Sequence, residues 1–290
     1  MRIGLQIPDF TWPGGPAELG RTLADIARTA DSVGFEYIGV MDHFFQISMV
    51  GPVENDMLEA YTTLGYLAAH TERAKLLTVV TGAIYRYPGL LAKAVTTLDV
   101  LSGGRGVLGV GAGWNEEESR GLGIPFASVK QRFEELEDAL QLALQMWRGD
   151  ETPFHGNHVH AERPLNVPQA LAKPHPPILI GGGGEQKTLR FVAKYAQACN
   201  LFPSPDLPHK LEVLREHCAN EGRDYDEIEK TGQTRFDLGR NGENINKTIE
   251  QLHALAEAGF SVAHGSMTNV SIPGQLDLLA EQVIPAAEKF

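Results

Sequence analysis

An aspartate and a histidine stand side by side at positions 42 and 43, directly after a short apolar run that predicts a buried strand. The imidazole of His43 can take up or release a proton near neutral pH, and Asp42 could orient that ring or hydrogen-bond a ligand. A strand-end pair can also do no more than cap the next segment. Their place directly after a strand favours chemistry, and we predict His43 and Asp42 as catalytic residues.

A glycine-rich turn, Gly109-Val110-Gly111-Ala112-Gly113-Trp114-Asn115, follows another apolar run. Its small residues would let a ligand approach the backbone closely, and Asn115 can cap the next helix. Trp114 would form a hydrophobic wall of a substrate pocket or pack against a neighbouring loop. A tight turn that needs glycine only for its backbone dihedrals explains the motif equally well.

Four consecutive glycines, Gly181-Gly182-Gly183-Gly184, are a more specific signal. They stand between an apolar run and a helical pattern over residues 187–196, so their amides would form a nest aimed at a helix N-terminus. That arrangement suits a phosphate. It is not a Walker A loop, because no Gly-Lys-Ser/Thr follows. A flexible turn is the alternative interpretation.

Other polar residues are less informative. Four histidines invite a metal interpretation, namely His155, His158, His160 and His175. Their spacings match no zinc pattern and no cysteine or carboxylate completes a set, so we predict no metal site. Acidic runs at residues 116–118 and 134–135 favour helix starts or solvated faces over a catalytic carboxylate pair. Arg86 could contact a ligand or be a buried structural residue, and His264 could line a pocket or lie in the core.

The elements that must position these residues follow a regular alternation. Eight short apolar runs alternate with amphipathic helical patterns, which is typical of the α/β class with a parallel sheet. The predicted strands cover residues 3–7, 37–41, 76–81, 107–110, 178–180, 198–202, 231–238 and 261–265. Eight units favour a closed (β/α)8 TIM barrel over an open doubly wound sheet, since no GxGxxG turn follows the first strand.

In such a barrel, the loops that follow the strands converge on one opening, so the candidate residues would meet there. We expect one domain over residues 1–290. Residues 149–177, rich in Pro, His and Gly, are too long for a plain connection between the fourth helix and the fifth strand. We interpret them as an insertion that packs on the outside or the N-terminal end of the barrel.

Composition excludes several functions. The formal net charge is −12 and no Lys/Arg-rich run offsets it, so we expect no nucleic-acid binding. Cys199 and Cys218 form no CxxC pair, which suits a reducing compartment. The sequence shows no secretion signal and no apolar stretch long enough to span a membrane. We therefore expect a cytoplasmic protein that acts on a small molecule.

Taken together, five motifs resemble the luciferase-like oxidoreductases, and more narrowly the branch that uses the deazaflavin coenzyme F420. They are Asp42-His43-Phe44, TGAIYRYP at 81–88, LDVLSGGR at 98–105, LGVGAGWNEE at 108–117 and ILIGGGGE at 178–185. Their order spans most of the chain. The resemblance implies a TIM barrel, a homodimer, and a coenzyme that lies across the barrel mouth.

The resemblance also implies roles for individual residues. Asp42 matches the position that contacts the deazaflavin ring, and His43 matches the adjacent catalytic position. The end of the third strand matches a non-prolyl cis peptide bulge behind the ring, at Val79, Val80 and Thr81. Two further sets match the loops that meet the ring, ribityl chain and phosphate: Gly111, Ala112, Gly113 and Asn115, and Gly181, Gly182 and Gly183.

Two positions depart from the pattern of the sugar-phosphate dehydrogenases of this family. Trp114 stands where they carry a catalytic glutamate after the glycine motif, and Ile47 stands where they carry a tryptophan. These departures argue against glucose-6-phosphate as the substrate.

The resemblance implies hydride transfer between coenzyme F420 and a small organic substrate, with His43 as the proton donor or acceptor. A flavin-dependent monooxygenase that uses FMN on the same barrel is the main alternative, since both coenzymes need a glycine-lined phosphate site. A metal-dependent barrel hydrolase and a non-catalytic flavin-binding protein are further alternatives.

Overall fold

The eight apolar runs form one closed parallel sheet in the computed structural model, which describes residues 1–290. The barrel strands are β1 (Arg2–Ile7), β2 (Tyr37–Val40), β3 (Lys75–Thr78) with its continuation β4 (Thr81–Gly82), β5 (Gly106–Gly111), β8 (Ile178–Gly181), β9 (Ala198–Leu201), β10 (Glu229–Arg235) and β11 (Val262–Ser266). Each strand pairs with the next in this order, and β11 pairs with β1, which closes the ring. The predicted (β/α)8 barrel is confirmed.

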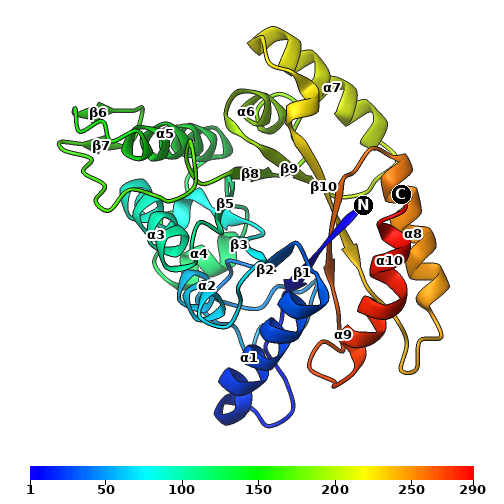
Figure 1. Cartoon of the computed structure of the whole chain (residues 1–290). Helices are drawn as coiled ribbons and strands as arrows, with labels where there is room; N and C mark the ends of the chain where they lie inside the picture. Colours follow the sequence, from blue (N-terminus) through cyan, green and yellow to red (C-terminus); the bar gives the residue numbers. More distant parts are fainter.

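Helices surround the sheet and cover its outer face (Figure 1). They are α1 (Pro16–Val33), α2 (Ala60–Ala68), α3 (Pro88–Leu101), α5 (Val129–Trp147), α6 (Thr188–Tyr195), α7 (Leu207–Glu221), α8 (Ile245–Glu257), and a last segment formed by α9 (Gln275–Leu278), η3 (Leu279–Val283) and α10 (Ile284–Ala287). Shorter pieces lie in the loops: η1 (Ala83–Tyr85), α4 (Glu116–Gly121) and η2 (Tyr225–Glu227). None of the helices is both long and apolar enough to cross a membrane.

Side chains alternate along the strands between two apolar clusters. Leu5, Ile38 and Leu76 point outward into the larger cluster, which includes the inner faces of the helices. The smaller cluster fills the barrel interior and contains Tyr37, Leu77, Val79, Val107, Leu179, Ala198 and Val262. Burying one such aliphatic side chain stabilises the fold by about 1.5–3 kcal/mol, so this alternation fixes which residues face the barrel axis.

A polar network closes the N-terminal end of the barrel. The hydroxyl of Tyr37 donates to Glu229 at 2.7 Å, and Arg2 forms an ion pair with the same carboxylate. Burial, followed by the charge of Glu229, raises the pKa of Tyr37. These contacts fill the barrel interior at the end opposite the carboxyl ends of the strands.

The predicted insertion packs on the outside of the barrel, against α3 and α5. It contains a small antiparallel pair, β6 (Phe154–His155) and β7 (His160–Ala161), which lies beyond α5 in Figure 1. Buried Asp138 of α5 accepts hydrogen bonds from the amides of His158 at 2.7 Å and Val159 at 3.1 Å. Buried Asp99 of α3 accepts another from the amide of Leu171 at 2.6 Å.

Apart from shifts of one residue at the strand ends, two predicted strands differ from the observed ones. The run predicted as 76–81 is interrupted after Thr78, where Val79 and Val80 are joined by a cis peptide bond at the position that the resemblance implies. The run predicted as 231–238 ends at Arg235. Phe236 and Leu238 are buried in the larger apolar cluster, but they do not continue the hydrogen-bonded pairing of β10. The strand was predicted too long because these two apolar residues resemble buried strand residues.

Candidate active site

A cavity of about 530 Å³ opens at the carboxyl ends of the strands. Every barrel strand, or the loop that follows it, contributes to its wall. Most of the predicted site residues line it, namely His43, Val79, Val80, Thr81, Gly111, Ala112, Gly113, Gly181, Gly182 and Gly183. Asp42 and Asn115 do not line it. The barrel therefore brings the imidazole and both glycine turns to one opening.

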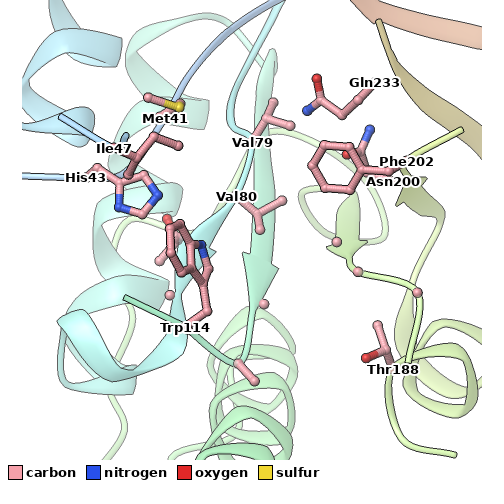
Figure 2. A pocket seen from close by; sticks show the side chains of 18 of the residues that line it. Met41, His43, Ile47, Val79, Val80, Trp114, Thr188, Asn200, Phe202 and Gln233 are labelled. Atoms are coloured by element: carbon pink, nitrogen blue, oxygen red, sulfur yellow. The ribbon is translucent and has the colours of Figure 1, made fainter. Parts of the chain in front are cut away.

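The residues that line the cavity fall into two groups of different character. The first group, which we call the apolar lobe, consists of Met41, His43, Ile47, Met49, Val50 and Trp114. The second group, which we call the glycine lobe, consists of Gly181, Gly182, Gly183, Gly184, Thr188, Arg132 and Phe133. In Figure 2, Val79 and Val80 stand between His43 and Trp114 on one side and Thr188 on the other.

His43 is held by contacts on two sides. Its Nδ1 atom lies 3.1 Å from Oε1 of Glu118, and its ring packs edge-on against Trp114 with the ring centroids 5.4 Å apart. The other ring nitrogen, Nε2, makes no hydrogen bond within the chain. Because the ring lines the cavity, Nε2 is the atom through which His43 can meet a ligand.

Glu118 is fully buried and accepts several hydrogen bonds. The amides of Phe44 and Phe45 donate to Oε2 at 2.6 and 3.0 Å, and the hydroxyl of Tyr85 donates to Oε1 at 2.6 Å. Burial favours the neutral acid, but hydrogen bonds from His43, Phe45 and Tyr85 outweigh it and hold the pKa of Glu118 below its usual value. A carboxylate only accepts hydrogen bonds, so we infer that the proton of the His43 ring sits on Nδ1.

The acidic run at 116–118 begins α4, as expected of a helix start, but Glu118 does not lie on a solvated face. Asn115 caps α4, with its side chain accepting from the amide of Glu118 at 3.2 Å, as predicted for a helix start. The side chain of Glu118, however, crosses to the loop after β2 instead of facing solvent. The local sequence does not show that Glu118 differs in role from Glu117. A glutamate three residues after an N-cap ordinarily hydrogen-bonds to the cap residue, and this explains its presence without any contact elsewhere.

Asp42 does not orient His43. Both of its carboxylate oxygens accept from Arg86, at 2.5 Å from Nη1 and 3.0 Å from Nη2, and its side chain has no solvent exposure. Arg86 also pairs with Glu59, the N-cap residue of α2. Burial opposes the charge of Arg86, but Asp42 and Glu59 raise the pKa of its guanidinium. Arg86 therefore joins the loops after β2 and β4 to α2.

The glycines serve both packing and access. A Cβ atom on Gly109 would lie 1.8 Å from the carbonyl oxygen of Thr78, so β3 and β5 can approach only if this residue is glycine. A Cβ atom on Gly181 would lie 2.9 Å from Val80. Gly182 has a φ of +114°, a conformation that other residues rarely adopt. Residues 185–187 then connect the turn at 181–184 to α6.

Arg132 adds a cation to the glycine lobe that sequence reasoning missed. It is 9% exposed, stacks on Phe126 with 4.1 Å to the ring centroid, and donates from Nη1 to the carbonyl of Ala127 at 2.6 Å. Its Nε atom has no partner in the chain. The next residue, Phe133, packs against Phe191 of α6. A buried cation, glycine amides and a helix N-terminus together form a site suited to an anion.

Polar side chains also line the cavity on the side of β9, β10, β11 and β1, and the sequence analysis did not single them out. They are Gln6, Asn200, Gln233 and Ser266. Asn200 donates to Thr231 at 2.8 Å, whereas Gln6 and Gln233 have no side-chain hydrogen bond within the chain. Single polar residues within apolar strands resemble ordinary strand residues, so only the closed barrel shows that they meet.

The remaining histidines lie away from the cavity. His264 is fully buried in the barrel interior, edge-on to Tyr37 at 5.2 Å, and burial lowers its pKa to about 4. In the outer segment, His158 pairs with Glu134 at 2.8 Å and His175 stacks on Trp147. No group of three or more His, Cys, Asp or Glu side chains could hold a metal ion.

Comparisons with known proteins agree with this architecture. An F420-dependent glucose-6-phosphate dehydrogenase from Nakamurella multipartita is 31% identical over 226 residues, which cover 74% of this chain and 62% of that protein. An F420-dependent secondary alcohol dehydrogenase in complex with an F420-acetone adduct superposes with a TM-score of 0.81 at 18% identity, covering 99% of this chain and 98% of that one.

A riboflavin lyase with modified FMN also superposes with a TM-score of 0.81, at 14% identity, covering 100% of this chain and 91% of that one. At such identities the two structural matches show a shared fold and nothing more. The sequence model of the family described as luciferase-like monooxygenase matches residues 1–276. The chain therefore belongs to the luciferase-like monooxygenase family.

Proposed function

We propose that this protein is an oxidoreductase that moves a hydride between coenzyme F420 and a small organic substrate, with His43 as the proton donor or acceptor. The observation that carries the proposal is the pairing of His43 with buried Glu118 at the wall of a cavity whose opposite lobe is built for an anion. A redox coenzyme with a phosphate tail would place its ring beside His43 and its phosphate in the glycine lobe.

The residues present fit such a coenzyme. Amides of the turn at 181–184, the N-terminus of α6 and the guanidinium of Arg132 would hold the phosphate. Val79 and Val80 would support one face of the ring. The carboxamides of Gln6 and Gln233, which lack partners, can donate to and accept from the alternating C=O and N–H groups of a pyrimidine edge.

Two predicted residues would act from behind the wall. We propose that Asp42 serves the site through Arg86, which its carboxylate holds in place. We propose that Asn115 serves it by capping α4, the helix that carries Glu118. Both would be positioning residues, because neither side chain lines the cavity.

The bound coenzyme would supply a carbon centre that accepts or releases a hydride. The chain supplies proton transfer. With its proton fixed on Nδ1 by Glu118, His43 presents Nε2 as a base toward the substrate hydroxyl and, once protonated, as an acid toward a substrate carbonyl. A positioned acid or base of this kind contributes about 10²–10⁴ to the rate.

An FMN-dependent monooxygenase remains the second candidate, favoured by the glycine lobe, which suits the phosphate of either coenzyme. The test is titration of the purified protein with F420 and with FMN, followed by visible absorbance. Our proposal expects saturable F420 binding and bleaching when a substrate is added. Tight FMN binding with oxygen consumption, and no F420 binding, would overturn it.

The assembly is also a proposal. We propose a cytoplasmic homodimer, as the resemblance to the F420-using branch implies. Sedimentation equilibrium would show a mass of twice 31.6 kDa for a dimer. A single species of 31.6 kDa would contradict the dimer and leave the proposed chemistry unaffected.

A further inference from the structure

The apolar lobe offers a substrate no charged partner apart from the His43 imidazole. No aspartate, glutamate or lysine lines the cavity, and its single arginine, Arg132, belongs to the glycine lobe. An ionised substrate group placed in the apolar lobe would lose its water without gaining an ion pair, which is costly. The apolar lobe therefore favours uncharged substrate groups.

Its rim exposes large apolar side chains. Met49 is 77% exposed, Trp114 57% and Val50 39%, whereas Met41 and Ile47 beneath them are buried. Neighbouring exposed apolar side chains at a concave site are typical of a surface that a ligand covers. A substrate with hydrocarbon substituents would remove this surface from water.

The charges behind the lobe act against an anionic substrate. Glu118 lies behind His43, and Asp42 and Glu59 share the single guanidinium of Arg86. Three carboxylates thus face one cation in this wall. A phosphate or carboxylate near His43 would meet a negative potential, because the guanidinium of Arg86 is already shared by two carboxylates.

On the side of His43, two side-chain polar atoms make no hydrogen bond within the chain, the Nε2 atom of that ring and the indole N–H of Trp114, and only Nε2 can accept a proton. Resting on the proposed function, we infer that the apolar lobe binds neutral, largely apolar alcohols and ketones, with their single oxygen at Nε2 of His43. In the oxidative direction, the C–H bond breaks and its electron pair leaves as hydride to the coenzyme. The hydroxyl proton passes to Nε2 of His43, and the C=O double bond forms.

Binding of unreactive ketones tests this inference without relying on turnover. Calorimetric titration of the protein loaded with oxidised F420 should show affinity rising from 2-butanone to 2-octanone. The expected gain is about fourfold for each methylene, which corresponds to about 0.8 kcal/mol. A keto acid of equal length should bind roughly 100-fold more weakly. A keto acid, sugar phosphate or alkylammonium ion that binds as tightly as the ketone overturns the inference.

Two variants test whether the preference for the ketone over the keto acid arises in the apolar lobe. Met49→Lys should reduce the preference for the ketone over the keto acid by about tenfold, because it places a cation at the rim of the apolar lobe. Val53→Lys is the matched control, since Val53 is exposed in the same loop but does not line the cavity. Equal effects of both variants would show that general surface charge is responsible and would overturn the assignment to the apolar lobe.

The two proposals fail in different ways. A protein that binds no F420 overturns the proposed function and, with it, this inference. A protein that binds F420 but prefers the keto acid overturns only the substrate class. Quenching of Trp114 fluorescence by the ketone, lost in Trp114→Phe, would place the ligand in the apolar lobe. Equal quenching in that variant would place it elsewhere and contradict the inference.

Discussion

The Nδ1 atom of His43 lies 3.1 Å from Oε1 of Glu118, a carboxylate without solvent exposure. This contact joins the loop after β2 to α4, the helix that follows β5. It fixes the orientation of the imidazole and the ring nitrogen that carries the proton. The proposed proton transfer depends on it.

Glu118→Gln tests this dependence. The amide keeps the shape but can present its NH2 group to Nδ1, so the neutral ring should shift toward the tautomer protonated on Nε2. Nitrogen NMR of the His43 ring should show an Nδ1–H tautomer in the native protein and lose it in the variant. We expect kcat to fall about 10- to 100-fold with a smaller change in KM and an altered pH profile.

Glu117→Gln is the control for that experiment, because Glu117 lies next in the chain with its side chain in solvent. It should leave both the tautomer and kcat unchanged. Should Glu118→Gln keep the native tautomer and the native pH profile, Glu118 would have only a structural role.

Arg132→Gln tests the phosphate site. Loss of a charge-assisted hydrogen bond of about 1.5–3 kcal/mol should weaken F420 binding roughly 10- to 100-fold. The phosphate-free deazaflavin nucleoside should bind equally well to both proteins, since Arg132 would contact only the phosphate. Arg120→Gln, at an exposed position on α4, should affect neither ligand. Equal weakening of both ligands by Arg132→Gln would indicate a packing role instead.

Asp42→Asn tests the proposal that Asp42 serves the site by holding Arg86 in place. Removing one partner of a buried ion pair leaves an uncompensated charge, so the free energy of unfolding should fall by about 3 kcal/mol. The measurement is denaturant unfolding. Asp25→Asn removes the carboxylate of an exposed pair with Arg28 and should cost less than about 1 kcal/mol. Unchanged stability in Asp42→Asn would show that the ion pair between Asp42 and Arg86 does not stabilise the fold.

His264 should make stability depend on pH. Burial lowers its pKa from 6.5 to about 4, so the unfolded chain binds more protons between these two values. The free energy of unfolding should therefore fall by up to about 3 kcal/mol as the pH falls from 6.5 to 4. His264→Leu should remove this part of the slope, and exposed His209→Leu should retain it. The same slope in native protein and His264→Leu would contradict the assignment.

The fold followed from the sequence because most barrel strands are continuous apolar runs covered on both faces. Their alternation with eight helical patterns favoured a closed sheet, and in a closed sheet the glycine turns and His43 share one opening. The interruption at Val79 and Val80 could not be read from the residues themselves, since two valines extend any strand pattern; only the resemblance pointed to it.

The site was only partly predictable, for reasons that lie in tertiary contacts. Glu118 stands at a position where local capping explains a glutamate, and Asp42 stands beside His43 in the chain but faces Arg86 in the fold. Gln6 and Gln233 belong to strands far apart in the sequence. Such partners become visible only when the barrel brings different strands together.

The most direct test of the central claim is the single-turnover rate of hydride transfer in native protein and His43→Ala. Both proteins are loaded with oxidised F420, and the bleaching of the coenzyme is followed after mixing with the secondary alcohol that corresponds to the tightest-binding ketone of the series above. The account predicts a rate about 10²- to 10⁴-fold slower in His43→Ala, with F420 affinity unchanged. An equal rate in the two proteins would contradict the assignment of proton transfer to His43.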